Sequence, residues 1–124
     1  MIQLGTLLKV IDNSGAKIVK CIGVLPGYKQ RYAFFGDIIT ISVQKLRARR
    51  RALVKVKKGQ VLPALILSTK TPLKESNQVL FNNSVVLLNK QYKLVGTKIF
   101  SSLPQYLRFT KFLRLTFLAR GLLA

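Results

Sequence analysis

The stretch GDIITISVQ, residues 36–44, decides the fold class because apolar and polar side chains alternate along it. Ile39, Ile41 and Val43 take every second position, and polar residues fill the positions between them. Side chains of a β-strand point alternately to its two faces, so this pattern predicts a strand with one buried face.

Strand patterns continue on both sides of this stretch. Val10 and Ile11 run into a turn at Asp12-Asn13-Ser14-Gly15, and apolar-rich segments follow at 17–25, 61–69 and 85–88. Asn, Ser and Gly suit tight turns through side-chain hydrogen bonds and positive φ. Short strands at such close spacing predict a small barrel rather than a parallel sheet, because no long helical pattern between them could supply crossovers.

The C-terminal part has a different character. Residues 103–108 predict a helical turn with proline near its start, and Leu113, Phe117 and Leu118 are spaced for a second short helix. We therefore expect a helical segment at about 103–120 within a single domain over residues 1–124.

Composition limits the functions to consider. The 124 residues hold 22 Lys and Arg against 3 acids, a formal charge of +19, while 49% of residues are hydrophobic. The apolar content excludes a disordered basic tail, and the charge favours a polyanionic partner. A membrane-spanning helix needs about 18 apolar residues, whereas the longest apolar runs, such as 61–67, fit buried strands.

Few side chains could carry catalysis. There is no histidine, and the only carboxylates, at Asp12, Asp37 and Glu75, lie far apart in the sequence. We interpret Asp12 as a turn residue and Asp37 as a strand-entry residue. Cys21, the only cysteine, fits a core position better than redox or metal chemistry, the alternative that stays open. The sequence predicts no enzyme, no metal and no cofactor.

The strongest functional signal is the stretch LRARRRALVKVKKG, residues 46–59, in which no acid interleaves with the basic residues. Its second half, 54–57, alternates apolar and basic side chains as half of a projecting hairpin would. Arginine binds phosphate oxygens in pairs and lysine acts as a point charge. We therefore expect the basic residues of this stretch to contact phosphates along a nucleic acid rather than to form a solvated charged loop. They are Arg47, Arg49, Arg50, Arg51, Lys55, Lys57 and Lys58.

Other basic residues are scattered, which suggests a partner that touches more than one face. This set comprises Lys9, Lys17, Lys20, Lys29, Arg31, Lys70, Lys98, Lys111 and Arg114. Four aromatic residues flank Lys29 and Arg31 and fit base stacking or core packing equally well: Tyr28, Tyr32, Phe34 and Phe35.

Three classes of protein fit these observations. The first is a structural RNA-binding protein, the second a free-standing barrel that binds single-stranded nucleic acid, and the third a cationic membrane-surface protein. The third needs a basic amphipathic helix, for which residues 109–120 are the only candidate.

Blocks of residues along the chain resemble the universal large-subunit ribosomal protein fourteen family. The blocks are Met1-Ile2-Gln3, Asp12-Asn13-Ser14-Gly15-Ala16, Cys21-Ile22, Arg31-Tyr32-Ala33, Gly36-Asp37-Ile38-Ile39, Val56-Lys57-Lys58-Gly59, Val85-Val86-Leu87-Leu88-Asn89, Gly96-Thr97-Lys98-Ile99-Phe100 and Lys111-Phe112. The resemblance covers nearly all of the chain, in order and at family-like spacing.

The resemblance implies a mainly β fold: a five-stranded barrel with a projecting basic hairpin and short C-terminal helices. It implies binding to large-subunit rRNA, a bridge to small-subunit rRNA, contacts with large-subunit ribosomal proteins three and nineteen, and docking of a ribosome-silencing factor. Asn13, Ser14 and the hairpin would face rRNA, together with Lys17, Arg31 and Lys70. The subunit-interface or silencing-factor surface would comprise Thr97, Lys98, Arg108, Lys111 and Arg114.

The chain also departs from the family pattern. Residues 47–53 are longer and more basic than the usual hairpin, and Arg120-Gly121 stands where acids are expected. The loss of acids suggests a diverged organellar lineage. Because no presequence precedes the first strand, we expect an organelle-encoded protein of the mitochondrial ribosome, with a plastid or bacterial origin as the alternative.

Overall fold

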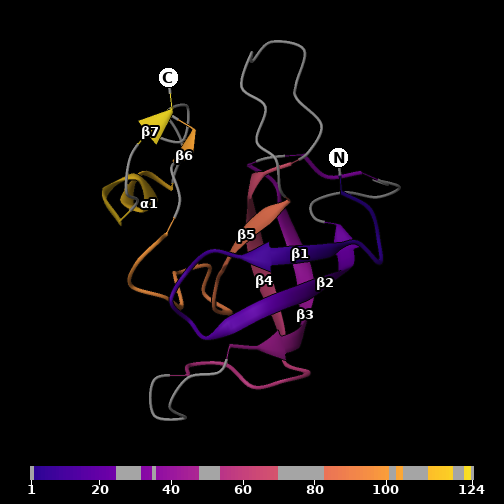
Figure 1. Ribbon diagram of the computed structural model, residues 1–124. Coiled ribbons are helices and arrows are strands. Elements are labelled where there is room, and N and C mark those ends of the chain that lie inside the picture. The colour runs from indigo at the N-terminus through magenta and orange to yellow at the C-terminus, as the bar shows by residue number, and fades with distance from the viewer. Residues whose placement is uncertain are drawn as a thin grey trace.

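A closed five-stranded barrel forms the body of the protein (Figure 1). The computed structural model describes residues 2–24, 32–34, 36–47, 54–69, 83–100, 103–104, 112–118 and 122–123. The barrel strands follow the chain in order: β1 (Leu7–Val10), β2 (Ala16–Val24), β3 (Ile38–Leu46), β4 (Val61–Ser68) and β5 (Ser84–Leu87). This confirms the predicted barrel.

Sequential strands pair antiparallel, whereas the pair that closes the barrel is parallel. β1 lies beside β5 with Lys9 opposite Ser84 and Val10 opposite Val85. The parallel closure makes the barrel mixed, a feature that the strand patterns alone did not predict.

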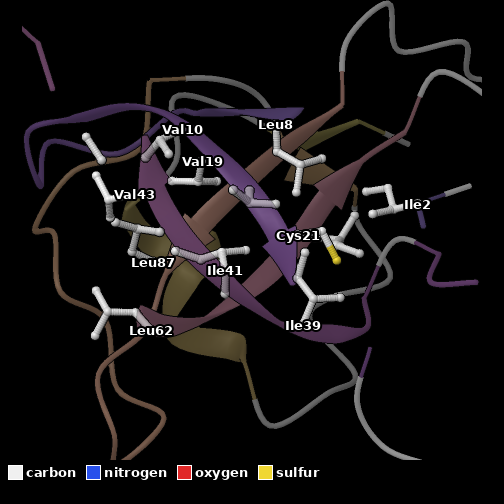
Figure 2. Close-up of a cluster of buried hydrophobic side chains, with 14 of the residues drawn as sticks. Ile2, Leu8, Val10, Val19, Cys21, Ile39, Ile41, Val43, Leu62 and Leu87 are labelled. Carbon is white, nitrogen blue, oxygen red and sulfur yellow. The ribbon is translucent and has the colours of Figure 1, made fainter. Parts of the chain in front are cut away.

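The barrel interior is filled by side chains at alternate strand positions. Ile39, Ile41 and Val43 of β3 all point inward and are almost completely buried, as their spacing predicts. Figure 2 shows them packed with Leu8 and Val19 from the two preceding strands.

A second core covers the outer face of β4 and β5. Ala64 and Ile66 face the barrel interior, while Leu65 and Leu67 pack with C-terminal residues on the other side. β4 is therefore buried on both faces, which explains why its sequence is a continuous apolar run rather than an alternation. The C-terminal residues of this second core are Ile99, Leu103 and Leu115.

The C-terminal elements lie together beside the barrel (Figure 1). They are β6 (Leu103–Pro104), α1 (Leu113–Leu118) and β7 (Leu122–Leu123), with β6 and β7 paired in parallel. The helical turn predicted over residues 103–108 does not include Leu103 and Pro104, which form β6, with Leu103 buried in the second core and paired with Leu122. The other residues of that prediction, 105–108, lie outside the described residues. Helix α1 exists as predicted.

The residues whose spacing predicts α1 are not the ones that the helix buries. Leu113, Phe117 and Leu118 are 42%, 78% and 36% exposed, and the residue that packs inward is Leu115. Three leucines and a phenylalanine in six residues make two faces of α1 apolar. Only the face that carries Leu115 packs against the second core.

The base of the basic loop, which we define as residues 47–55, is not a regular hairpin. β3 ends at Leu46, and residues 54–57 form no strand, although Val56 is buried and Lys55 and Lys57 are exposed, as the alternation suggested. Backbone hydrogen bonds at this position go to the 12–15 turn instead of to a facing strand. The predicted tip, residues 48–53, lies outside the described residues.

Cys21 is a core residue of β2. Its side chain is 1% exposed among the barrel side chains (Figure 2), and its thiol donates to the Gly23 carbonyl at 3.7 Å. Burial raises the pKa of the Cys21 thiol, because the thiolate would lose its hydration. Within the described part of the chain, no three His, Cys, Asp or Glu residues gather as a metal site. The core interpretation is confirmed.

Adjacent leucines in β1 provide a matched test of the core. Leu8 is 1% exposed and Leu7 is 61% exposed. Leu8→Ala should lower the free energy of unfolding by about 2–5 kcal/mol because it leaves a cavity, and Leu7→Ala by less than about 0.5 kcal/mol. Urea denaturation of both variants measures the difference, and equal losses would contradict the assignment of faces.

Cys21 should react slowly with a thiol reagent at pH 8 in the folded protein and rapidly in urea. Because burial raises the pKa of the Cys21 thiol in the folded state, the contribution of Cys21 to the free energy of unfolding is fully present below the ordinary thiol pKa of about 8.5. This contribution falls as pH rises above that value. Reagent kinetics and urea titrations between pH 7 and pH 10 test both points. Rapid labelling of the native protein would contradict the buried position.

Candidate nucleic-acid interface

The 12–15 turn, which joins β1 to β2, is built around a buried carboxylate. Asp12 is 1% exposed, and its Oδ1 accepts hydrogen bonds from the Ser14 amide at 3.0 Å and the Ser14 hydroxyl at 2.5 Å. Its Oδ2 accepts from the Leu87 amide of β5 at 3.1 Å. All of these contacts fix backbone position, so Asp12 has the structural role expected of a turn residue.

The same turn fastens both ends of the basic loop. The Gly15 carbonyl accepts from the Arg47 amide at 2.8 Å, and the Ser14 carbonyl accepts from the Lys55 amide at 2.9 Å. Gly15 has φ +102°, and a Cβ there would lie 2.9 Å from Val54. Only glycine fits this position, because it tolerates both the left-handed backbone and the close approach of the loop.

Asn13 connects the turn to a third segment, residues 95–100. Its Oδ1 accepts from the amides of Thr97 at 2.6 Å and Lys98 at 3.2 Å, and its Nδ2 donates to the Thr97 hydroxyl at 2.7 Å. Gly96 is packed so tightly here that a Cβ would lie 2.7 Å from the Asn13 Oδ1. The Phe100 amide donates to the Ile11 carbonyl at 2.8 Å, which extends the contact.

These connections bring three basic residues, which we call the turn cations, to one place: Arg47, Lys55 and Lys98. The Arg47 Nη2 donates to the Val10 carbonyl at 2.7 Å, and its guanidinium carbon lies 5.4 Å from the centre of the Phe100 ring. The Lys55 ammonium donates to the Val95 carbonyl at 3.3 Å, and Lys98 is exposed. Arg47 is half-buried and keeps further N–H donors beyond this bond.

The described carboxylates do not neutralise the turn cations. Asp12 is buried, and each of its oxygens is hydrogen-bonded to Ser14 or Leu87. Asp37 accepts from the Phe34 amide at 2.9 Å just before β3, at the opposite end of that nine-residue strand from Arg47. The cations therefore face solvent without a described acidic partner.

The remaining residues predicted to bind rRNA fall into three groups. Lys17, Lys57 and Lys58 are exposed, and Lys17 lies two residues after the 12–15 turn. Ser14 is fully buried, so its side chain positions the turn and has no accessible surface for a partner. Five predicted residues lie outside the described residues: Arg31, Arg49, Arg50, Arg51 and Lys70.

The predicted interface set is partly brought together. Thr97 and Lys98 are exposed, and the next residue, Ile99, donates its amide to the Leu118 carbonyl of α1 at 3.4 Å. Arg114 is exposed on the same helix, one turn before Leu118. Arg108 and Lys111 lie outside the described residues.

Two of the four predicted aromatic residues can be placed. Tyr32 and Phe34 are 41% and 42% exposed on either side of Ala33, which is buried and pairs with Ile2. They lie in the segment that leads to Asp37, away from the 12–15 turn. Base stacking by them stays a prediction, and Tyr28 and Phe35 lie outside the described residues.

Across the described ranges, no helix is long and apolar enough to cross a membrane. Helix α1, within the predicted 109–120 segment, has six residues.

The barrel and the turn cations define a small, highly basic β-barrel protein with a surface suited to polyanions. Comparison with protein families identifies it more closely: the family model of ribosomal protein L14p/L23e matches residues 1–123. The chain belongs to this family of large-subunit ribosomal proteins. Family membership also confirms that it is a structural protein of the ribosome and not an enzyme.

Sequence reasoning named Asn13, Thr97 and Lys98 as site residues but missed the contact that joins them. The contact between Asn13 and Thr97 spans 84 positions, and nothing in the local pattern of either segment indicates it. Gly96 was noted only as part of a family block, although its missing side chain makes room for Asn13. A glycine between two strand-like segments is the one signal that could have suggested a close approach.

Asp12→Asn should lower the free energy of unfolding by about 1–3 kcal/mol, because an amide NH₂ would face a buried donor now satisfied by the carboxylate. Asp37→Asn is the matched control, since that side chain is partly exposed and receives one described hydrogen bond. Thermal unfolding at constant salt compares the two. A larger loss at Asp37 would contradict the role of the turn.

Proposed function

We propose that this protein is a structural constituent of the large ribosomal subunit that binds large-subunit rRNA through phosphate contacts. The observation that carries the proposal is the convergence of Arg47, Lys55 and Lys98, from three separate segments, on one turn without an accessible described carboxylate. Like charges gathered around one turn repel one another, and a bound polyanion would neutralise them.

The basic loop extends this surface. Its two ends are held at Gly15 and Ser14 through the amides of Arg47 and Lys55, and Lys57 and Lys58 follow it with exposed side chains. Fixed cations lose less conformational entropy when they bind phosphate than cations on a free tail. We include three further arginines of the same loop in the rRNA-binding set: Arg49, Arg50 and Arg51. Arg31 and Lys70 join them as predicted phosphate contacts.

The segment at Thr97 and Lys98, with Arg114 on α1, is proposed as the subunit interface. There it would meet small-subunit rRNA, or a ribosome-silencing factor when the subunits are kept apart. The hydrogen bond between Ile99 and Leu118, which holds the two parts together, supports this assignment. Arg108 and Lys111 are proposed to belong to the same surface.

Contacts with large-subunit proteins three and nineteen are also proposed. The outer wall of the barrel carries a row in which Leu7, Lys20, Ser42 and Val61 lie opposite one another across β1 to β4. Leu7 and Val61 are more than half exposed. Exposed aliphatic side chains on a sheet suit a protein neighbour better than a phosphate backbone.

For location, we propose the mitochondrial ribosome, with plastid and bacterial ribosomes as the alternatives. The support is compositional: the chain keeps 3 acidic residues against 22 basic ones. Immunodetection of the protein in fractionated organelles would test this part without affecting the rRNA-binding proposal.

Sedimentation distinguishes the proposal from a free-standing barrel that binds single-stranded nucleic acid. A ribosomal constituent should migrate with intact large subunits in high salt. A free-standing protein should be stripped from the particles and remain at the top of the gradient, and that result would contradict the proposal.

The salt dependence of rRNA binding should be steep. If about six phosphates are contacted, a plot of the logarithm of the binding constant against the logarithm of the salt concentration should have a slope of about −4 to −5. Lys55→Ala with Lys57→Ala should reduce that slope by about 1.5 and weaken binding to any large-subunit rRNA segment similarly.

Lys9→Ala with Lys20→Ala is the control for this experiment, because it removes the same charge from the outer wall of the barrel. The control pair should change the slope less. Equal losses from both pairs would mean that total charge, and not the surface around the 12–15 turn, governs binding.

A further inference from the structure

The rRNA-facing residues and the Thr97–Lys98 segment meet at the side chain of Asn13. We infer that they form one composite rRNA-binding surface, in which Lys98 contacts the same RNA as Lys55 and Asn13 is the positioning residue. This inference rests on the proposed function, and it adds that Lys98, one of the turn cations, depends on Asn13 for its position.

The first step is the way in which Asn13 is used. Its carboxamide makes three hydrogen bonds to residues 97 and 98, at 2.6, 3.2 and 2.7 Å. One acceptor therefore holds two successive amides, which fixes the direction in which the Lys98 side chain leaves the backbone. Three of the four hydrogen bonds that a carboxamide can make go to this segment, so Asn13 acts mainly through Lys98.

The second step is the proximity of the two lysines. The Lys55 ammonium lies 3.3 Å from the Val95 carbonyl. Lys98 follows Val95 by three residues, a span of at most about 11 Å even when extended. Phosphates along one nucleic-acid strand recur at shorter intervals than this, so one RNA segment can reach both cations.

The third step is the packing that keeps the segment in place. Gly96 is buried against the turn, and a Cβ there would meet the Asn13 Oδ1 at 2.7 Å and the Asp12 Cβ at 3.1 Å. The Val95 amide donates to the Leu87 carbonyl, and the Leu87 amide donates to Asp12. The 95–98 segment is thus held from both sides.

A double-mutant cycle between Asn13→Ala and Lys98→Ala tests the inference, with deproteinised large-subunit rRNA as the probe. Loss of one phosphate contact should weaken binding about sixfold at 0.1 M salt, and we expect this for each single variant. If Asn13 acts through Lys98, the double variant should bind no more than about twofold worse than Asn13→Ala alone.

Lys20→Ala provides the matched control, because this lysine is exposed on β2 and is paired with Leu7, away from the turn. Its effect should multiply with that of Asn13→Ala. If the effects of Asn13→Ala and Lys98→Ala also multiply, to about 36-fold, the positioning role is overturned.

Two further variants keep the test valid if Asn13→Ala folds poorly. Gly96→Ala displaces the Asn13 amide without removing it, and the same coupling to Lys98→Ala is expected. Asn13→Asp keeps acceptors for both amides, so hydrogen exchange at Thr97 and Lys98 should be as slow as in the unchanged protein. Fast exchange in Asn13→Asp would contradict the inference.

The outcomes separate this inference from the proposed function. If Lys55→Ala weakens rRNA binding and Lys98→Ala does not, the composite surface is wrong while rRNA binding through the loop stands. If Arg47→Ala, Lys55→Ala and Lys98→Ala all leave rRNA binding unchanged, the proposed function itself fails.

Discussion

The buried carboxylate of Asp12 is the interaction on which the arrangement of this molecule depends. It joins the end of β1 to Leu87 of β5 and, through Ser14, shapes the turn to which the basic loop is attached. Both of its oxygens serve as acceptors for backbone and hydroxyl donors. Because they are enclosed, a partner at the surface cannot reach them, and the accessible charged groups around the turn are cations.

A net charge of +19 on 124 residues would work against a compact chain if the core were weak. Two cores oppose it, one inside the barrel and one between the outer face of β4 and β5 and the C-terminal elements. The shared strand β4 lets a short chain bury apolar residues on both sides of one sheet. Charge and burial are thus separated in space, because the described lysines lie at the surface, some of them on the outer wall of the barrel and some around the 12–15 turn.

The fold was largely predictable, because strands with one buried face carry a local signal. The alternation at Ile39, Ile41 and Val43 gave the position of β3, and the apolar run of β4 indicated burial on both faces. The C-terminal segment was harder, because Leu103 and Leu115 take their places from contacts with the second core rather than from local spacing. The helix was found, but its inward face was not.

For the candidate site, composition predicted the kind of ligand and the basic residues, but not their geometry. The hydrogen bonds between Asn13 and the residues Thr97 and Lys98 join segments more than eighty positions apart, and no periodicity encodes such a contact. Ser14 was predicted to face rRNA, yet its side chain is enclosed by the turn that it helps to build. Local patterns thus identify which residues are charged, whereas tertiary contacts determine which of them act together.

The parallel pairing of β1 with β5 has a consequence for the order of events during synthesis. β1 is made first, but its second neighbour, Ser84–Leu87, emerges only after roughly two thirds of the chain has been translated. Until then one side of β1 keeps unpaired amides and carbonyls, and the apolar interior has an open seam. Closure depends on the pairing of β1 with β5, the first and last strands of the barrel. Contacts between residues so far apart in the sequence form slowly. The barrel of the nascent chain therefore stays open until β5, its last strand, has been made.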